Sequence, residues 1–282
     1  MYKFDLLIIN HFKMKNIFIA LTLTLSFYVT SAQTDRVYHS ATYINDVAAS
    51  EVPRFIELHK KFTDMSLGEN RKHTGDWLFR HWYGSGHTFV IYEQFNSMED
   101  FHADSDLFLE NINNSINAIK DEATKEATKK EWIEYRAFSD GHTDEVRVSS
   151  PTSVLSAENV NFDIPFVMVV GKYNSSGNWV KMGNAFFDWR IKPEVDSNTS
   201  ISGGVSYHFM GSGHEVEVWQ CYNSLVDFST SVTNSAPQDD SLAESRKTFW
   251  SLVSGSHEDQ IYLHIGHVDT EKGTFDLAGK DN

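Results

Sequence analysis

The 282-residue chain is poor in cysteine, in proline and in positive charge. Cys221 is its one cysteine, which excludes an internal disulfide framework and a zinc site built from several thiolates. It has 24 Lys and Arg against 39 Asp and Glu, a formal net charge of -15. The negatively charged phosphates of a nucleic acid repel a chain with this net negative charge, so nucleic acid is not an expected partner. Hydrophobic residues make up 40% of the sequence, which is enough for a packed core.

The N-terminal residues have the pattern of a secretory signal peptide. Lys15 precedes an apolar run over 17–29, and small residues follow up to Ala32. The run is shorter than the roughly 20 apolar residues of a membrane span, and no later stretch is long enough for one. The junction Ala32-Gln33 resembles signal peptidase sites of exported proteins in the Bacteroidetes group. We expect cleavage after Ala32, a secreted or periplasmic product, and no membrane span in the mature chain.

One block of sequence occurs twice. HWYGSGHTFVIYEQFNSMEDF at 81–101 matches HFMGSGHEVEVWQCYNSLVDF at 208–228 without a gap, at a constant offset of 211 − 84 = 127. A weaker echo follows, SDGHTDEVRV at 139–148 against SGSHEDQIYL at 254–263. A repeat of this length predicts a duplicated structural unit. The shorter offset of the second echo, 257 − 142 = 115, places the extra residues of the first copy within 102–130.

The pattern of each copy predicts the order strand, helix, strand, strand, helix, strand. In the first, Ser50 is a candidate helix cap before Pro53, and Asn96-Ser97 is a second one. Alternating β-branched and aromatic residues predict the strands. The expected strands are 37–44, 76–83, 87–95 and 143–149, then 165–173, 204–222 as a hairpin, and 259–267. The expected helices of the second copy lie near 178–190 and within 224–253.

This order is the ferredoxin-like split βαβ motif, so the expected fold is α+β with two tandem ferredoxin-like units. The division predicted is a signal peptide at 1–32, a first unit at 33–150, a polar linker at 151–164 and a second unit at 165–282. The Gly-containing hairpins and the following N-S-[ML]-x-D-F segments, within 84–101 and 211–228, resemble the dimeric α/β-barrel superfamily, here fused in one chain. The resemblance implies that two sheets close a pseudo-two-fold barrel, so that no oligomer is required for closure. That superfamily includes antibiotic-biosynthesis-type monooxygenases, stress-responsive barrel proteins and haem-handling enzymes.

Strand alternation sorts the predicted hairpins into two faces. A three-residue turn at 84–86 places Tyr83 opposite His87 and Phe79 opposite Ile91, and we assign this apolar face to the helices. The opposite face then lines the space between the sheets, although a bulge at the turn would exchange the two. The candidate ligand-lining residues on that face are Arg80, Trp82, Tyr92, Tyr207, Glu217 and Trp219.

Histidines recur in both hairpins, as His81 with His87 and as His208 with His214. Neutral imidazole is a common metal or haem ligand, which makes haem an alternative cofactor. The other interpretation is that His87 and His214 hydrogen-bond the tight Gly-Ser-Gly turns and were duplicated with them. Because no ligand set of known spacing accompanies them, no metal and no cofactor are expected.

The predicted function is binding of a small apolar or aromatic molecule in an aromatic-lined barrel. An enclosed apolar space with a few polar groups is typical of a small-molecule site. The resemblance implies an alternative, a cofactor-independent monooxygenase that uses Arg80, Trp82, Tyr92 and Trp219. A haem-binding barrel is the other alternative. Asp76, Glu215 and Glu217 are the carboxylates available for acid–base work.

Overall fold

The computed structural model describes residues 36–68, 70–158, 160–234 and 240–279. The predicted signal peptide at 1–32 lies outside these described residues. Within them, every helix is too short or too polar to cross a membrane. The elements below all belong to the unit that begins at Val37.

The order of the strands and helices along the chain follows the order predicted from the hydrophobic pattern. Up to residue 149 they are β1 (Val37–Ile44), α2 (Val52–Ser66), β2 (Gly75–Tyr83), β3 (Phe89–Phe95), α3 (Met98–Ala118), α4 (Glu122–Ala137) and β4 (Thr143–Ser149). After it come β5 (Val154–Ser156), β6 (Val167–Ser175), α5 (Trp179–Phe186), α6 (Lys192–Asp196), β7 (Ser202–Gly211), β8 (Val216–Tyr222), α7 (Leu225–Asn234), α8 (Asp240–Leu252), β9 (Val253–Asp269) and β10 (Thr274–Leu277). The hairpin of α3 and α4 accounts for the extra residues expected within 102–130.

In the described residues the strands form a closed antiparallel barrel. The order around it is β9-β2-β3-β1-β4-β7-β8-β6, and β6 pairs again with β9 to complete the ring. Closure removes the unpaired strand edges that would otherwise attract another chain. Two short strands lie off the ring, β10 beside β9 and β5 beside β7. The sequence pattern did not reveal these two.

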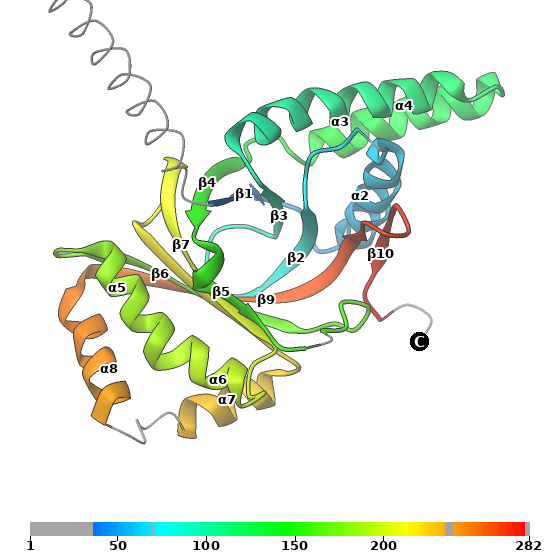
Figure 1. Cartoon of the computed structure of the whole chain (residues 1–282). Helices are drawn as coiled ribbons and strands as arrows, with labels where there is room; N and C mark the ends of the chain where they lie inside the picture. Colours follow the sequence, from blue (N-terminus) through cyan, green and yellow to red (C-terminus); the bar gives the residue numbers. More distant parts are fainter. Residues whose placement is uncertain (1–35, 69, 159, 235–239, 280–282) are drawn as a thin grey trace, which may run out of the picture. The chain divides into compact units, whose positions relative to one another are not determined.

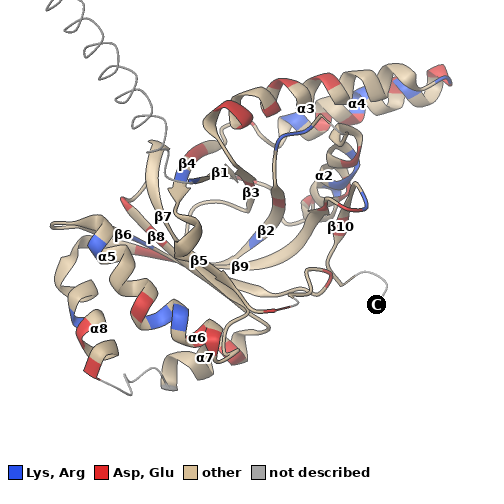
Figure 2. Ribbon diagram, viewed as in Figure 1, with Lys and Arg blue, Asp and Glu red and all other residues tan. Residues whose placement is uncertain are grey.

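Helices cover opposite sides of the barrel (Figure 1). On one side α2, α3 and α4 pack on β1–β3 through a buried apolar cluster that includes Phe55, Phe62 and Phe89. On the other side α5 and α8 pack on β6–β8 around Met182, Val205 and Phe249. The charged residues of α3 are all acidic, whereas acidic and basic residues are interspersed along α4 (Figure 2), as expected for solvated helix faces. On each of these two sides an apolar layer therefore lies between the outer face of the barrel and the helices.

Two predicted helix caps have different outcomes. Ser97 caps α3, since its Oγ accepts a hydrogen bond of 3.0 Å from the backbone N–H of Asp100. Ser224 does the same for Asp227 at 3.2 Å. Ser50 is not the cap of α2, which begins after Glu51 with no side-chain cap. Pro53 is in the first turn of α2, where its missing N–H costs nothing.

The predicted pairing of the hairpin strands is wrong by one residue. Leu78, not Phe79, lies opposite Ile91, and Phe79 lies opposite Val90. The cause is a longer connection between β2 and β3, in which the carbonyl of Thr88 accepts from the N–H of His81 at 2.9 Å. The same shift occurs in the second hairpin, where Val205 lies opposite Val218. Because side chains alternate, a shift of one residue turns β2 and β7 over while β3 and β8 keep their predicted faces.

Candidate functional site

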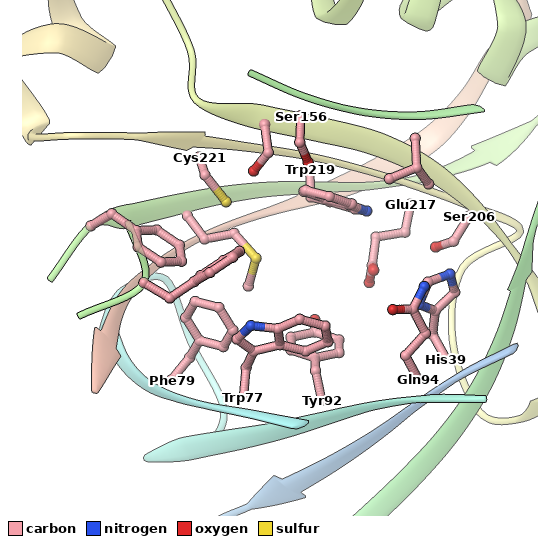
Figure 3. Close-up of a pocket in the computed structure, with 15 residues that line it drawn as sticks. His39, Trp77, Phe79, Tyr92, Gln94, Ser156, Ser206, Glu217, Trp219 and Cys221 are labelled. Atoms are coloured by element: carbon pink, nitrogen blue, oxygen red, sulfur yellow. The ribbon is translucent and has the colours of Figure 1, made fainter. Parts of the chain in front are cut away.

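A cavity of about 210 Å³ lies inside the barrel (Figure 3). Both halves of the chain contribute to its lining, and so does the segment between β4 and β6. The lining residues are His39, Trp77, Phe79, Tyr92, Gln94, Val154, Ser156, Phe162, Phe166, Met168, Ser202, Ser206, Glu217, Trp219 and Cys221. Aromatic and sulfur-containing side chains make up most of this wall.

Two indole rings form opposite walls of the cavity. Trp77 extends from β2 and Trp219 from β8, which lie on opposite sides of the barrel (Figure 3). Behind Trp219 lies Gly204, where a Cβ would come within 2.7 Å of the ring, so glycine is needed there for the indole to lie flat on the strand. Both tryptophans are only half-buried, because part of each ring faces the cavity. The arrangement leaves room for a flat ring between two flat walls.

One end of the cavity is polar. The carboxylate of Glu217 points into the cavity, and His39, Gln94 and Ser206 lie beside it (Figure 3). His39 shares a hydrogen bond of 3.0 Å between its Nε2 and the hydroxyl of Ser149. The hydroxyl of Tyr92 is buried and has no hydrogen-bond partner among the described residues. Buried polar groups are normally satisfied, so this hydroxyl is available to a ligand.

Glu217 also belongs to a buried network of charges deeper in the barrel. Its Oε1 lies 3.9 Å from Nε of Arg147, and its Oε2 lies 3.4 Å from Nζ of Lys172. A second carboxylate, Glu145, contacts Arg147 directly and lies 3.6 Å from Lys172. Lys172 also donates to the hydroxyl of Tyr43 at 2.5 Å. The network contains two carboxylates and two cations, so it is neutral overall.

These charges, together with burial, set the protonation states of Glu217 and His39 at the polar end of the cavity. Burial alone would raise the pKa of Glu217, but the charges of Arg147 and Lys172 outweigh it and hold the pKa below its ordinary value. Burial lowers the pKa of His39 to about 4 despite the opposing charge of Glu217. At neutral pH the site therefore presents an ionised carboxylate beside a neutral imidazole.

The hydroxyl and thiol groups of the cavity stay protonated. Burial, followed by the charge of Glu217, raises the pKa of Tyr92 well above its ordinary value. Burial raises the pKa of Cys221 to about 12, so its thiol is not a nucleophile at neutral pH. Acceptors and donors are thus both present: Glu217 and His39 can accept a proton or hydrogen bond, and Tyr92 can donate one.

The predicted lining residues divide into two groups. Tyr92, Glu217 and Trp219 line the cavity. Arg80 and Trp82 do not: Arg80 is exposed on the outer face of β2, and Trp82 is 47% exposed at its end. Tyr207 faces α5, where its hydroxyl donates to the carbonyl of Val180 at 3.3 Å. All three errors come from the one-residue shift of β2 and β7.

The structure separates the four repeated histidines from the cavity. His81 and His87 lie together near the first hairpin, with ring centroids 5.1 Å apart. The rings of His87 and His214, which the turn interpretation names, make no hydrogen bond to the turns among the described residues; it is His208 that shares one of 3.1 Å with the carbonyl of Gly211. None of the four lines the cavity.

The cavity does not fit a haem. Its volume of about 210 Å³ lies below the roughly 300–1,000 Å³ of sites for drug-sized ligands, and haem is larger than those. His264 lies behind Phe166, on which it is stacked with centroids 4.3 Å apart, and it does not line the cavity. His39 is engaged with Ser149 through its Nε2.

The sequence did not predict half of the cavity wall, nor the network of buried charges. Trp77 and Phe79 were visible as an alternating aromatic pair, but the assumed turn placed them on the wrong face. Arg147 and Lys172 are single charges inside the apolar strand segments VRV and VGKY, which is the signal for a buried ion pair. Glu145 is on the same strand as Arg147, but Glu217 comes from β8, and only the barrel brings it and Lys172 to Arg147.

Comparison with family models and with curated proteins finds no match. Solved structures do resemble the fold. An anthrone oxidase-like protein superposes with a TM-score of 0.51 at 11% identity, covering 84% of this chain and 94% of that one. Proteins provisionally named monooxygenases, from Lactobacillus acidophilus NCFM and Fusobacterium nucleatum, give TM-scores of 0.50 and 0.55 at 11% and 7% identity. They cover 87% and 83% of this chain, and 97% and 94% of their own chains. These likenesses establish the α+β barrel fold.

The neutral state of His39 predicts a pH dependence of stability. The folded pKa, about 4, lies below the ordinary value of 6.5, so the unfolded chain takes up a proton first as the pH falls. This histidine therefore contributes stability above pH 6.5 that is lost between pH 6.5 and about 4. In His39→Gln the free energy of unfolding, measured with urea, should fall less steeply over this range, by about 1.4 kcal/mol per pH unit.

Exposed His102 provides the control, and His102→Gln should leave the slope unchanged. An unaltered slope in His39→Gln would mean that the imidazole is charged in the folded protein.

Proposed function

We propose that the barrel binds a small planar aromatic molecule that carries a hydroxyl group, such as a phenol with one or two rings. The observation that carries the proposal is the position of Glu217 at the end of a slot between the indoles of Trp77 and Trp219. Aromatic pairs contribute about 0.5–1.5 kcal/mol beyond the area they bury, so a flat ring is favoured between the two walls.

The size of the cavity supports a ligand of one or two fused rings. A cavity of about 150 Å³ holds benzene. The cavity here, about 210 Å³, has room for a second ring but not for a drug-sized molecule.

The charges of the site support a neutral ligand that donates a hydrogen bond. The ionised carboxylate of Glu217 accepts from a hydroxyl group, and such charge-assisted bonds are among the strongest in proteins. The buried network already balances Glu217 with Arg147 and Lys172, so no spare positive charge remains for an anion. A carboxylate or phosphate ligand would face Glu217 without a counter-charge.

Binding of 2-naphthol tests the proposal. It should quench tryptophan fluorescence in the wild type, and Trp219→Ala should weaken binding at least about tenfold because one wall is lost. 2-Naphthoate should bind at least about tenfold more weakly than 2-naphthol, because Glu217 repels it.

Trp82→Ala is the matched control, since Trp82 is 47% exposed and lies outside the cavity. Equal losses in the two tryptophan variants, or no binding of any aromatic compound, would remove the proposal.

The second candidate function is oxidation of such a phenol by O2 without a bound cofactor. The ionised carboxylate of Glu217 at one end of the slot favours it, because it can take the phenolic proton as the ring loses electrons. With a hydroquinone the step balances: the substrate gives up two electrons and two protons and becomes the quinone, and O2 takes them up and becomes H2O2.

Oxygen consumption with a panel of hydroquinones and polyphenols separates the two functions. An oxidase should consume O2, and Glu217→Gln should slow it about 100-fold, which is typical for loss of a general base. Glu244→Gln, which alters an exposed surface ion pair, should leave the rate of oxygen consumption unchanged. Binding without oxygen consumption at any pH leaves a binding protein.

We further propose that the barrel arose from two tandem ferredoxin-like units, 33–150 and 165–282, joined by the linker 151–164. The strand order supports this, since β4-β1-β3-β2 in the first part corresponds to β9-β6-β8-β7 in the second. We also propose export, on the strength of the signal-like pattern before Ala32. An experimental structure whose two parts do not superpose contradicts the first, and a mature protein that keeps residues 1–32 contradicts the second.

A further inference from the structure

A second cluster of titratable side chains lies outside the barrel interior, between the outer face of β2 and β3 and helix α3. His73 and Arg71 come from the loop that leads into β2, Asp76 from β2, Glu93 from β3 and Asp104 from α3. All are buried except Glu93, whose side chain is 26% exposed. The cavity ligand does not reach this cluster, because none of these residues lines the cavity.

Three of these residues have the geometry of a metal-binding set. One ligand atom from each of His73, Glu93 and Asp104 lies within 4.8 Å of the others. His73 Nδ1 and Asp104 Oδ2 are 3.7 Å apart, which is too long for a hydrogen bond. Two ligand atoms on one tetrahedral zinc ion lie about 3.3 Å apart, so a small contraction would suffice.

The imidazole of His73 independently indicates a missing partner. Its side chain is 3% exposed, and its Nδ1 has no hydrogen-bond partner among the described residues. An unpaired imidazole nitrogen in such a place is uncommon, because buried polar atoms are normally satisfied. A metal ion at this nitrogen would satisfy it.

Asp104 is already held in position. Arg71 Nε donates to its Oδ1 at 2.9 Å, and the backbone N–H of Lys72 donates to the same oxygen at 2.6 Å. Arg71 Nη2 donates to Oδ2 at 2.7 Å, and Ser66 in turn accepts from Arg71 Nη1 at 2.7 Å. Ligating carboxylates are typically fixed by such outer partners, and a carboxylate oxygen can accept more than one.

The cluster has too little positive charge. Asp76 lies directly opposite Glu93 in the β2–β3 pairing, so their side chains are neighbours on one face of the sheet. Oδ1 of Asp76 is buried without a partner among the described residues. Three carboxylates thus share one guanidinium, and a divalent cation would balance them.

We propose that His73, Glu93 and Asp104 bind a divalent transition-metal ion such as zinc or manganese, with Asp76 as the adjacent carboxylate that completes the charge balance. A nitrogen ligand with carboxylate oxygens suits these ions better than calcium or magnesium, which take oxygen ligands alone. The ion would link α3 and the loop before β2 to strand β3 of the sheet. The proposal does not depend on what the barrel cavity binds.

Metal binding to the whole chain, purified without a histidine tag and stripped with a chelator, tests the proposal. Zinc and manganese are added separately, and the bound metal is measured after dialysis by mass spectrometry. We expect about one equivalent of at least one of them per chain, together with a rise in the thermal midpoint. In His73→Gln the affinity should fall at least about 100-fold, and Glu93→Gln should also weaken binding.

The exposed pair of His142 and Asp144, whose atoms lie 3.0 Å apart, offers a matched control. His142→Gln should bind metal as the wild type does. If Asp104→Asn fails to fold, His73→Gln and Glu93→Gln still decide the outcome, because they leave the Arg71–Asp104 pair in place. Absence of stoichiometric binding overturns the proposal, and so does equal binding by wild type and His73→Gln.

Discussion

The neutral charge network inside the barrel is the constraint on which the rest of the structure depends. Glu145 and Arg147 come from β4, Lys172 from β6 and Glu217 from β8, and all four are nearly inaccessible to water. Removing one partner of a buried ion pair typically costs about 3–5 kcal/mol, because the other charge is left uncompensated. The strands that carry these residues must therefore meet in one register, and that register also sets which side chains reach the cavity.

The network divides the interior into two chemical environments. Towards the hairpins the space is occupied by charges, Tyr43 and Tyr262. Towards the other end the side chains are aromatic and the space stays open. Glu217 lies at the boundary and belongs to both, since its carboxylate contacts Lys172 at 3.4 Å and also borders the cavity. The cavity therefore lies at the aromatic end.

The sequence predicted the strand and helix order because each element has a strong local pattern. It also predicted Tyr92, Glu217 and Trp219 on the inner face, since β3 and β8 alternate cleanly. It did not predict the faces of β2 and β7, because Thr88 is held by Asn45, and Glu215 in the second hairpin by Asn174, in contacts that are distant in sequence. The charge network and the His73 cluster likewise arise only when separate strands and a helix meet.

A crystal structure of the complex with 2-naphthol shows directly where the ligand lies. We expect the naphthalene ring between the indoles of Trp77 and Trp219, with its hydroxyl within hydrogen-bond distance of Glu217 or His39. A ring bound at the outer surface, or a cavity that remains filled by its own side chains at saturating ligand, would contradict it.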